Sequence, residues 1–286
     1  MKSLLPKPVR RTARRFVAAA TRPWIGRARL AEQLRLLGVR RGGILLVHSS
    51  LSALGYVPKG PTAVLNALED ALGPDGTLVM PTHTWKWANQ GSREFDVRTT
   101  PSGVGILSET FRRQPGVLRS AHPTHSVAAR GSMAAELIRD HDLAGTPCGE
   151  DTPYCRLFEW DGQILLLGVE LRRNTSFHAV EALAEVPYLM REEPDEFLIR
   201  DADGTERAQS IRMHAPARKS RFNEMEPLLR DAGALRKDRT GGSMSLLLEG
   251  NAFRDTMLAQ LRANPFYVLA AGRPDEKSPV STSAGI

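Results

Sequence analysis

The chain has 286 residues, of which 41% are hydrophobic and 25% charged, so it can bury a large core and is not a disordered protein. No run approaches the roughly 20 apolar residues that cross a bilayer, and the basic start lacks the apolar stretch of a signal peptide. Cys148 and Cys155 are too few for a disulfide framework, which favours a soluble protein in the reducing cytoplasm.

The net charge of +7 is concentrated near the N-terminus. Residues 1–50 contain 12 Lys or Arg and one acid, Glu32, which gives +11, so the other 236 residues carry −4. A mildly acidic body suits a cationic small molecule better than a nucleic acid, so we expect no nucleic-acid partner. We predict a basic arm at 1–29, a single domain at 30–268 and a loose C-terminal tail at 269–286.

Strand and helix patterns alternate along the predicted domain. A buried strand at 42–50 leads to a helix at 61–73, with Pro61 in its first turn and Gly73 at its end. Further strands are expected at 76–84, 125–131, 163–169 and 243–250, and further helices at 101–116, 132–142, 152–160, 174–186, 221–233 and 251–265. Residues 193–213 instead predict an antiparallel hairpin with an Asp-Gly turn. The expected fold is α/β, a three-layer core with a mostly parallel sheet, plus a hairpin insert that walls a cleft.

Two loops have the composition of anion sites. Ser49-Ser50-Leu51-Ser52 follows the first buried strand, and the loop at 101–105 precedes a helix that carries Arg112 and Arg113. Hydroxyls, free backbone N–H groups and helix N-termini bind phosphate. Neither loop matches a P-loop or a strict dinucleotide fingerprint, and ordinary turns are the alternative.

His178 and Glu181 are the main candidates for acid–base chemistry. Asn174 and Thr175 are favoured N-cap residues, so a helix should begin near Thr175 and place His178 in its first turn. Glu181, three residues on, would share a face with it. A helix N-terminus favours neutral imidazole, and a carboxylate on the other ring nitrogen would stabilise the imidazolium that forms. A surface pair without a role is the alternative.

Other polar residues stand at predicted strand ends. His83 follows the second strand, and the loop His122-Pro123-Thr124-His125-Ser126 lacks the further ligands of a zinc site, so no metal is expected. Asp96 is a loop acid that suits an ammonium group. A serine hydrolase would need a G-x-S-x-G motif, which the chain does not have.

Four segments in this order resemble the aminoglycoside 3-N-acetyltransferase family, a family distinct from the GNAT acetyltransferases. They are LLVHSSLSALGYVPKGPTAVLNALEDALGPDGTLVMPTHTW (45–85), P-S-G-x-G-x-L-S-E-x-F-R (101–112), HPTHSVAARG (122–131) and LLLGVELRRNTSFHAVE (165–181). The resemblance runs from about Leu30 to Asn264. It implies transfer of acetyl from acetyl-CoA to an amine of an aminoglycoside or related amino-sugar, by direct transfer in a ternary complex.

The resemblance also implies roles for individual residues. His178 would be the general base and Glu181 its partner. Ser49, Ser50, Leu51 and Ser52 would hold the coenzyme, with Thr82, Ser102, Arg112 and Ser126 completing the channel. Asp96 would face the cationic substrate, with His83 and His125 also on the substrate side. Backbone N–H or hydroxyl groups near Ser49, Ser50 or Thr82 are expected to stabilise the oxyanion.

The acceptor and the assembly stay open at this point. Arg172 and Arg173, where small or acidic residues would be expected, would repel a polycation near the mouth of the cleft. A less cationic biosynthetic amino-sugar is therefore an alternative to an antibiotic, and a CoA-binding protein without turnover is a third interpretation. The sequence leaves open whether the protein is a homodimer.

Overall fold

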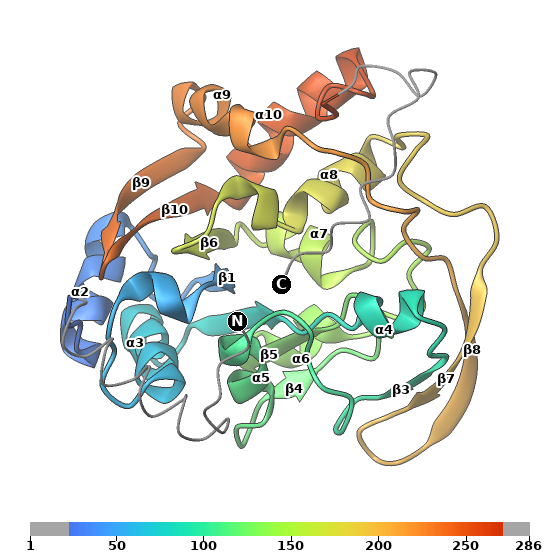
Figure 1. Ribbon diagram of the computed structural model, residues 1–286, viewed down its shortest axis with the longest axis horizontal. Helices are drawn as coiled ribbons and strands as arrows, with labels where there is room; N and C mark the ends of the chain where they lie inside the picture. Colours follow the sequence, from blue (N-terminus) through green and yellow to red (C-terminus); the bar gives the residue numbers. More distant parts are fainter. Residues whose placement is uncertain (1–22, 271–286) are drawn as a thin grey trace, which may run out of the picture.

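A seven-stranded mixed sheet forms the centre of the computed structural model, which describes residues 23–270 (Figure 1). In spatial order its strands are β4 (Leu118–Arg119), β5 (Val127–Gly131), β2 (Thr77–Pro81), β1 (Ile44–Ser49), β6 (Gln163–Leu167), β10 (Ser243–Glu249) and β9 (Leu235–Thr240). Strand β1 pairs in parallel with β2 and β6, and the outer pairs are antiparallel. The ends of β2, β1 and β6 therefore meet at one edge, called here the carboxyl edge.

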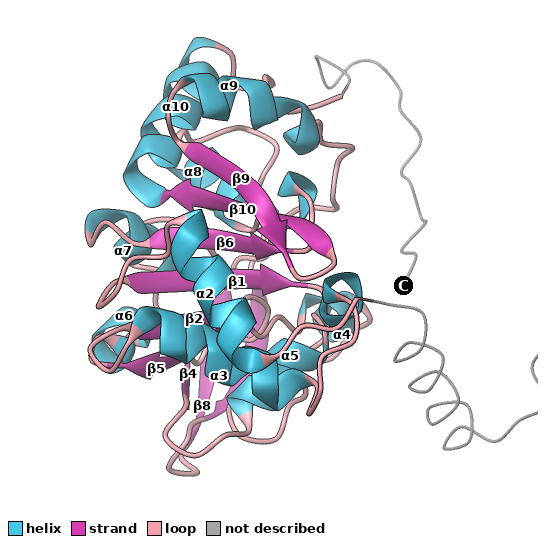
Figure 2. Ribbon diagram, turned by 90° about the vertical axis from the view of Figure 1, so that its left-hand side faces the viewer, coloured by secondary structure: helices cyan, strands magenta, loops and turns pink. Residues whose placement is uncertain are grey.

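Helices cover both faces of this sheet, which confirms the three-layer α/β prediction. One face carries α2 (Arg27–Leu37), α3 (Pro61–Leu72) and α5 (Ile106–Arg112), and Figure 2 shows α2 and α3 in front of the strands. The other face carries α6 (Ala134–Ile138), α7 (Pro153–Glu159), α8 (Ser176–Leu183), α9 (Glu226–Asp231) and α10 (Gly250–Ala263). Strand residues alternate between the two cores: Leu45 and Val47 pack toward α2 and α3, and Leu46 packs toward α7 and α8.

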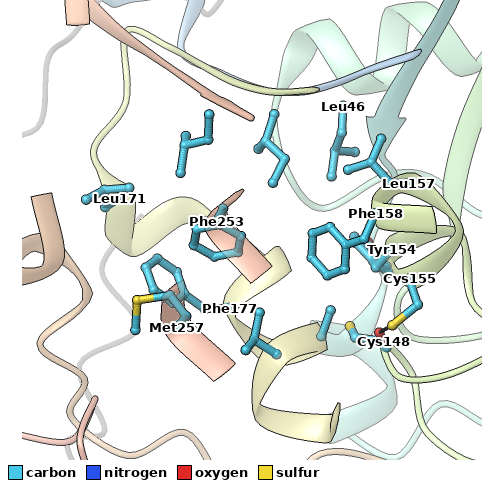
Figure 3. Packing of buried hydrophobic residues seen from close by; sticks show 14 of the residues in the cluster. Leu46, Cys148, Tyr154, Cys155, Leu157, Phe158, Leu171, Phe177, Phe253 and Met257 are labelled. Carbon is cyan, nitrogen blue, oxygen red and sulfur yellow. Dashed lines mark hydrogen bonds between the residues drawn. The ribbon is translucent and has the colours of Figure 1, made fainter. Parts of the chain in front are cut away.

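Aromatic packing fixes α8 against its neighbours (Figure 3). The fully buried ring of Phe177 lies parallel to that of Phe222 with centroids 4.1 Å apart, and meets Phe253 of α10 edge-on at 5.0 Å. Phe222 belongs to the short helix η3 (Phe222–Met225). Each fully buried Phe contributes about 1.5–3 kcal/mol, and paired rings add roughly 0.5–1.5 kcal/mol. This packing holds the first turn of α8 in a fixed place.

A second, three-stranded sheet contains the predicted hairpin. Strands β7 (Asp195–Arg200) and β8 (Glu206–Ile211) pair antiparallel, and β3 (Glu94–Asp96) adds to β7 in parallel. A small core of its own, with Phe95, Phe197 and Ile199 as its largest members, packs beneath this sheet. The short helix α4 (Trp85–Asn89) contributes Ala88 to the same core.

Several features differ from, or lie outside, the sequence expectations. The predicted boundary at 29/30 falls inside α2, and Ile25 is already buried. Most of the predicted arm and tail, residues 1–22 and 271–286, lies outside the described residues. Strand β9 was not predicted because only its two end residues are buried. None of the helices described within 23–270 is long and apolar enough to span a membrane.

Candidate active site

The first turn of α8 presents His178 at the carboxyl edge. The side-chain oxygen of Asn174 accepts the backbone N–H of Ser176 at 3.0 Å, and the N–H of His178 is bonded to the carbonyl of Thr175 at 2.9 Å. The helix therefore begins within one residue of the predicted position. Thr175 is the N-cap residue, and the Asn174 bond forms a turn just before the helix, so the three-residue spacing from His178 to Glu181 places both side chains on one face.

His178 and Glu181 form the expected pair. Nδ1 of His178 lies 2.6 Å from Oε2 of Glu181, which leaves Nε2 as the free ring nitrogen. The Glu181 side chain is 3% exposed and that of His178 is 36% exposed, so the carboxylate is buried and the imidazole is open to a ligand. Tyr188, which sequence analysis missed, donates its hydroxyl to Oε1 of Glu181 at 2.9 Å. Burial and the neighbouring Glu181 raise the pKa of Tyr188, so it remains a donor. Both carboxylate oxygens thus have a partner.

The predicted coenzyme loop lies at the ends of β1 and β6. The hydroxyls of Ser50 and Ser52 are 3.2 Å apart, and Leu51 opens the short helix η1 (Leu51–Leu54). The backbone is close to Gly168 after β6, where an added Cβ would lie 2.9 Å from Cβ of Ala53. The N–H groups of Ser50 and Thr82 are bonded to the carbonyls of Leu167 and Ser126. They are therefore not free to act as the oxyanion donors expected from the sequence.

Thr82 and Ser126 lie together but face inward. Both are fully buried, and their hydroxyls share a hydrogen bond of 2.9 Å. Arg119, also buried, donates to the hydroxyl and the carbonyl of Thr82 at 3.1 and 2.8 Å, and to the carbonyl of Thr100 at 2.6 Å. Burial lowers the pKa of Arg119 to about 9. These side chains bond within the protein, so they support the strand ends and do not present free groups to a coenzyme.

The second predicted anion loop also reaches this edge. The N–H of Gly103 donates to the carbonyl of His83 at 2.8 Å, which places the loop beside the end of β2. The N–H of Ser102 and the guanidinium of Arg112 both donate to Glu109, at 2.8 and 2.6 Å. Helix α5 begins at Ile106, five residues after Pro101. Because the Arg112 side chain is 2% exposed and paired with Glu109, it orders the loop from within and does not face a ligand.

Asp96 lies at the end of β3, in the smaller sheet. Its Oδ1 accepts the N–H groups of Arg98 and Thr99, both at 2.8 Å, and its Oδ2 lies 3.6 Å from Arg200. Partial burial would raise the pKa of Asp96, but the hydrogen bonds from Thr99 and Arg98 and the charge of Arg200 outweigh it, so the pKa is lowered. The carboxylate is therefore charged and one-fifth exposed.

Six of the seven histidines form a continuous series of ring contacts. His178 meets His214 at a centroid distance of 5.1 Å, His214 meets His125 at 4.6 Å, and His125 meets His83 at 4.8 Å. A branch continues from His125 through His122 to His141. Burial and the neighbouring imidazoles lower the pKa values of His83, His122, His125 and His214 well below 6.5. These rings are therefore neutral at pH 7, and His214 is a further member that no local pattern had indicated.

Several buried polar atoms of segments near this edge have no hydrogen-bond partner. Among the described residues, buried side-chain atoms without a partner include Nε2 of His48, Nδ2 of Asn174, Oγ of Ser176, Nε2 of His214 and Oγ of Ser243. Orphaned polar groups are costly and are typical of ligand sites. No group of His, Cys, Asp and Glu within residues 23–270 is arranged to hold a metal ion. Cys148 and Cys155 are buried, and burial raises the pKa of both thiols, so neither is an activated nucleophile.

An α/β fold with a His–Glu pair and a hydroxyl-rich loop at the carboxyl edge defines a candidate two-substrate transferase. The profile of the aminoglycoside 3-N-acetyltransferase family matches residues 46–262, and the chain belongs to that family. It is 44% identical over 164 residues to aminoglycoside N(3)-acetyltransferase IV of a Salmonella species. That match covers 57% of this chain and about 60% of the relative's length.

Solved structures agree over more of the chain. A variant of aminoglycoside acetyltransferase AAC(3)-IVa, in complex with gentamicin, superposes with a TM-score of 0.75 and 35% identity, over 87% of this chain and 92% of that one. The binary complex of AAC-IIIb with CoASH superposes with a TM-score of 0.72 and 25% identity, over 84% and 97%.

Proposed function

We propose that this protein is an N-acetyltransferase that moves acetyl from acetyl-CoA to an amine of an aminoglycoside or related amino-sugar. The observation that carries the proposal is the His178–Glu181–Tyr188 arrangement, with a free imidazole nitrogen at the carboxyl edge. The family assignment supports it, as do the CoASH and gentamicin complexes of the two similar structures.

The base acts on the incoming amine. The ammonium group gives a proton to Nε2 of His178, and the nitrogen lone pair then attacks the thioester carbonyl. Glu181, bonded at Nδ1, fixes the tautomer and offsets the charge of the imidazolium. The attacking nitrogen then loses its second proton to solvent. When the tetrahedral intermediate collapses, the carbon–sulfur bond breaks and the imidazolium returns its proton to the thiolate of CoA. Both substrates are present together, so no acetyl-enzyme forms.

The two substrates approach the base from different sides. We assign Ser49 to Ser52, together with Ser102, to acetyl-CoA, because their hydroxyls lie beside the ends of β1 and β2. We assign His83, His125 and the charged Asp96 to the acceptor side. Thr82, Ser126 and Arg112 support these loops from within.

Replacing His178 tests the mechanism. His178→Ala should lower kcat by about two to four decades, the usual size of a lost general base, and should leave CoA binding within twofold. Glu181→Gln should cost less, because the amide oxygen still accepts the imidazole N–H but carries no charge. The assay measures thiol release from acetyl-CoA with gentamicin or apramycin, and calorimetry measures CoA affinity.

Two outcomes would change the conclusion. A fully active His178→Ala enzyme would refute the mechanism even with the family assignment intact. CoA binding without thiol release across a wide panel of amines would favour the interpretation that the protein binds CoA but has no turnover. Activity confined to weakly cationic amino-sugars would favour a biosynthetic acceptor, as Arg172 and Arg173 suggest.

A further inference from the structure

His214 is the histidine of the ring series for which the fold supplies no hydrogen bond, although it touches the base. It follows β8 and pairs as an isolated bridge with Met190, so the segment after the hairpin carries it to the site. The bonds from Ala215 N–H to the Leu189 carbonyl, at 2.8 Å, and from Arg191 N–H to the Met213 carbonyl, at 3.0 Å, fix its backbone. Its ring meets that of His178 nearly edge-on, at 5.1 Å and 62°.

The other buried rings of the series are anchored by hydrogen bonds. His141 shares a bond with Ser120 and contacts the carbonyl of Pro147, both at 2.9 Å, and Nδ1 of His122 accepts two backbone N–H groups. His83 and His125 each use one nitrogen, toward Tyr154 and Thr124. The remaining nitrogen of each, Nδ1 and Nε2 respectively, makes no hydrogen bond within residues 23–270. In His83 and His125, therefore, one nitrogen holds the ring in place and the other is available to a ligand.

His214 makes no side-chain hydrogen bond to any described residue, and its Nε2 is buried without a partner. Nothing in the described fold therefore fixes its tautomer, so either nitrogen can act as donor or acceptor. His214 is half-buried, and its buried Nε2 without a partner is costly, so a ligand that hydrogen-bonds to the ring would be stabilised there.

We propose that His214, with His83 and His125, forms an uncharged hydrogen-bonding wall that positions the acceptor beside His178. This inference rests on the proposed function and assigns a residue to its acceptor side. The wall lies toward β2 and β5, whereas the serine loop lies toward β1 and β6, so His214 contacts the acceptor and not acetyl-CoA. The ligand chemistry is a hydroxyl or neutral amine next to the acetylated nitrogen, since a neutral imidazole bonds either group.

The test uses the full chain with gentamicin as acceptor and compares two substitutions. His214→Phe keeps an aromatic ring against His178 but removes both nitrogens, so KM for gentamicin should rise three- to tenfold, the size of one neutral hydrogen bond. KM for acetyl-CoA should change less than twofold. His214→Gln places an amide near the position of Nε2 and should keep KM for gentamicin within twofold of the native value. If His214→Phe does not fold, His214→Met replaces it.

Phe222→Leu is the matched control. Phe222 is the other ring that contacts His178, at 5.9 Å, and it has no polar side-chain atom. This variant should alter kcat and leave KM for gentamicin unchanged. The proposal is overturned if His214→Phe lowers kcat alone, as a packing role would, or if His214→Gln raises KM as much as His214→Phe. If the native protein neither binds nor acetylates gentamicin or any other amine, the proposed function itself fails, which is a distinct result.

Discussion

Lowering the pH from 7 to 5.5 should strongly destabilise this protein, because six of its seven histidines are held neutral. Burial lowers the pKa of His48 to about 3 and that of His141 to about 4, and it also lowers the pKa values of His83, His122, His125 and His214 well below 6.5. In the unfolded chain each imidazole titrates near 6.5. Below that pH the unfolded state binds protons that the folded state does not. The stability is therefore complete above about pH 6.5 and is lost as the pH falls.

The magnitude follows from linkage. One histidine of this kind lowers the free energy of unfolding by about 1.2 kcal/mol between pH 7 and pH 5.5, so His48 and His141 alone lower it by about 2.4 kcal/mol, and the other four act in the same direction. A typical domain has a total of about 5–15 kcal/mol, so this loss is a large part of the stability. Carboxylates with lowered pKa values, such as Asp96 and Glu109, act in the same direction but only at lower pH.

The assay is guanidinium denaturation at half-unit steps from pH 5.5 to 7.5, followed by tryptophan fluorescence. His122→Asn is the matched variant, because an amide oxygen can accept the N–H groups of Thr124 and His125 that Nδ1 of His122 accepts at 3.2 and 3.1 Å. Below pH 6, this variant should reduce the slope of the free energy of unfolding against pH by about 1.4 kcal/mol per pH unit. A total loss under about 2 kcal/mol between pH 7 and 5.5 would refute the neutral cluster.

Two substitutions test the assignment of the two substrate sides. Ser50→Glu should weaken CoA binding in calorimetry, because a carboxylate beside the serine loop opposes the phosphates; unchanged affinity would move the coenzyme site elsewhere. Asp96→Asn keeps an oxygen that can accept the N–H groups of Arg98 and Thr99, so the turn should survive. In this variant KM should rise for the acceptor more than for acetyl-CoA. A change in KM confined to acetyl-CoA would show that Asp96 does not face the acceptor.

Local chemistry explains which parts of the site the sequence could predict. The turn at Asn174 and the spacing of His178 and Glu181 lie within eight residues, so helix geometry alone brings the pair together. The serine loop was predictable because it directly follows a buried strand. Strand β9 was not, because an edge strand with four exposed central residues carries no apolar pattern.

The residues that were missed depend on distant segments. Arg119 meets Thr82 across 37 positions, and His214 meets His125 only after the hairpin has packed on β3. Tyr188 reaches Glu181 from beyond the end of α8. None of these contacts follows from a period or a motif. The inward orientation of Thr82 and Ser126 could not be predicted for the same reason, because Arg119, the buried cation that engages them, belongs to no sequence pattern.

The histidine cluster and the base depend on each other. In the proposed reaction the acceptor releases a proton beside several imidazoles, yet only His178 combines a half-open ring with a buried carboxylate on its other nitrogen. The surrounding rings have lowered pKa values, so they can hydrogen-bond the acceptor without taking its proton. Because these rings are neutral, they do not repel the imidazolium of His178 when it forms. The burial that keeps these rings neutral is expected to make the fold sensitive to acid, so the proposed selective proton transfer and the predicted acid lability have one physical cause.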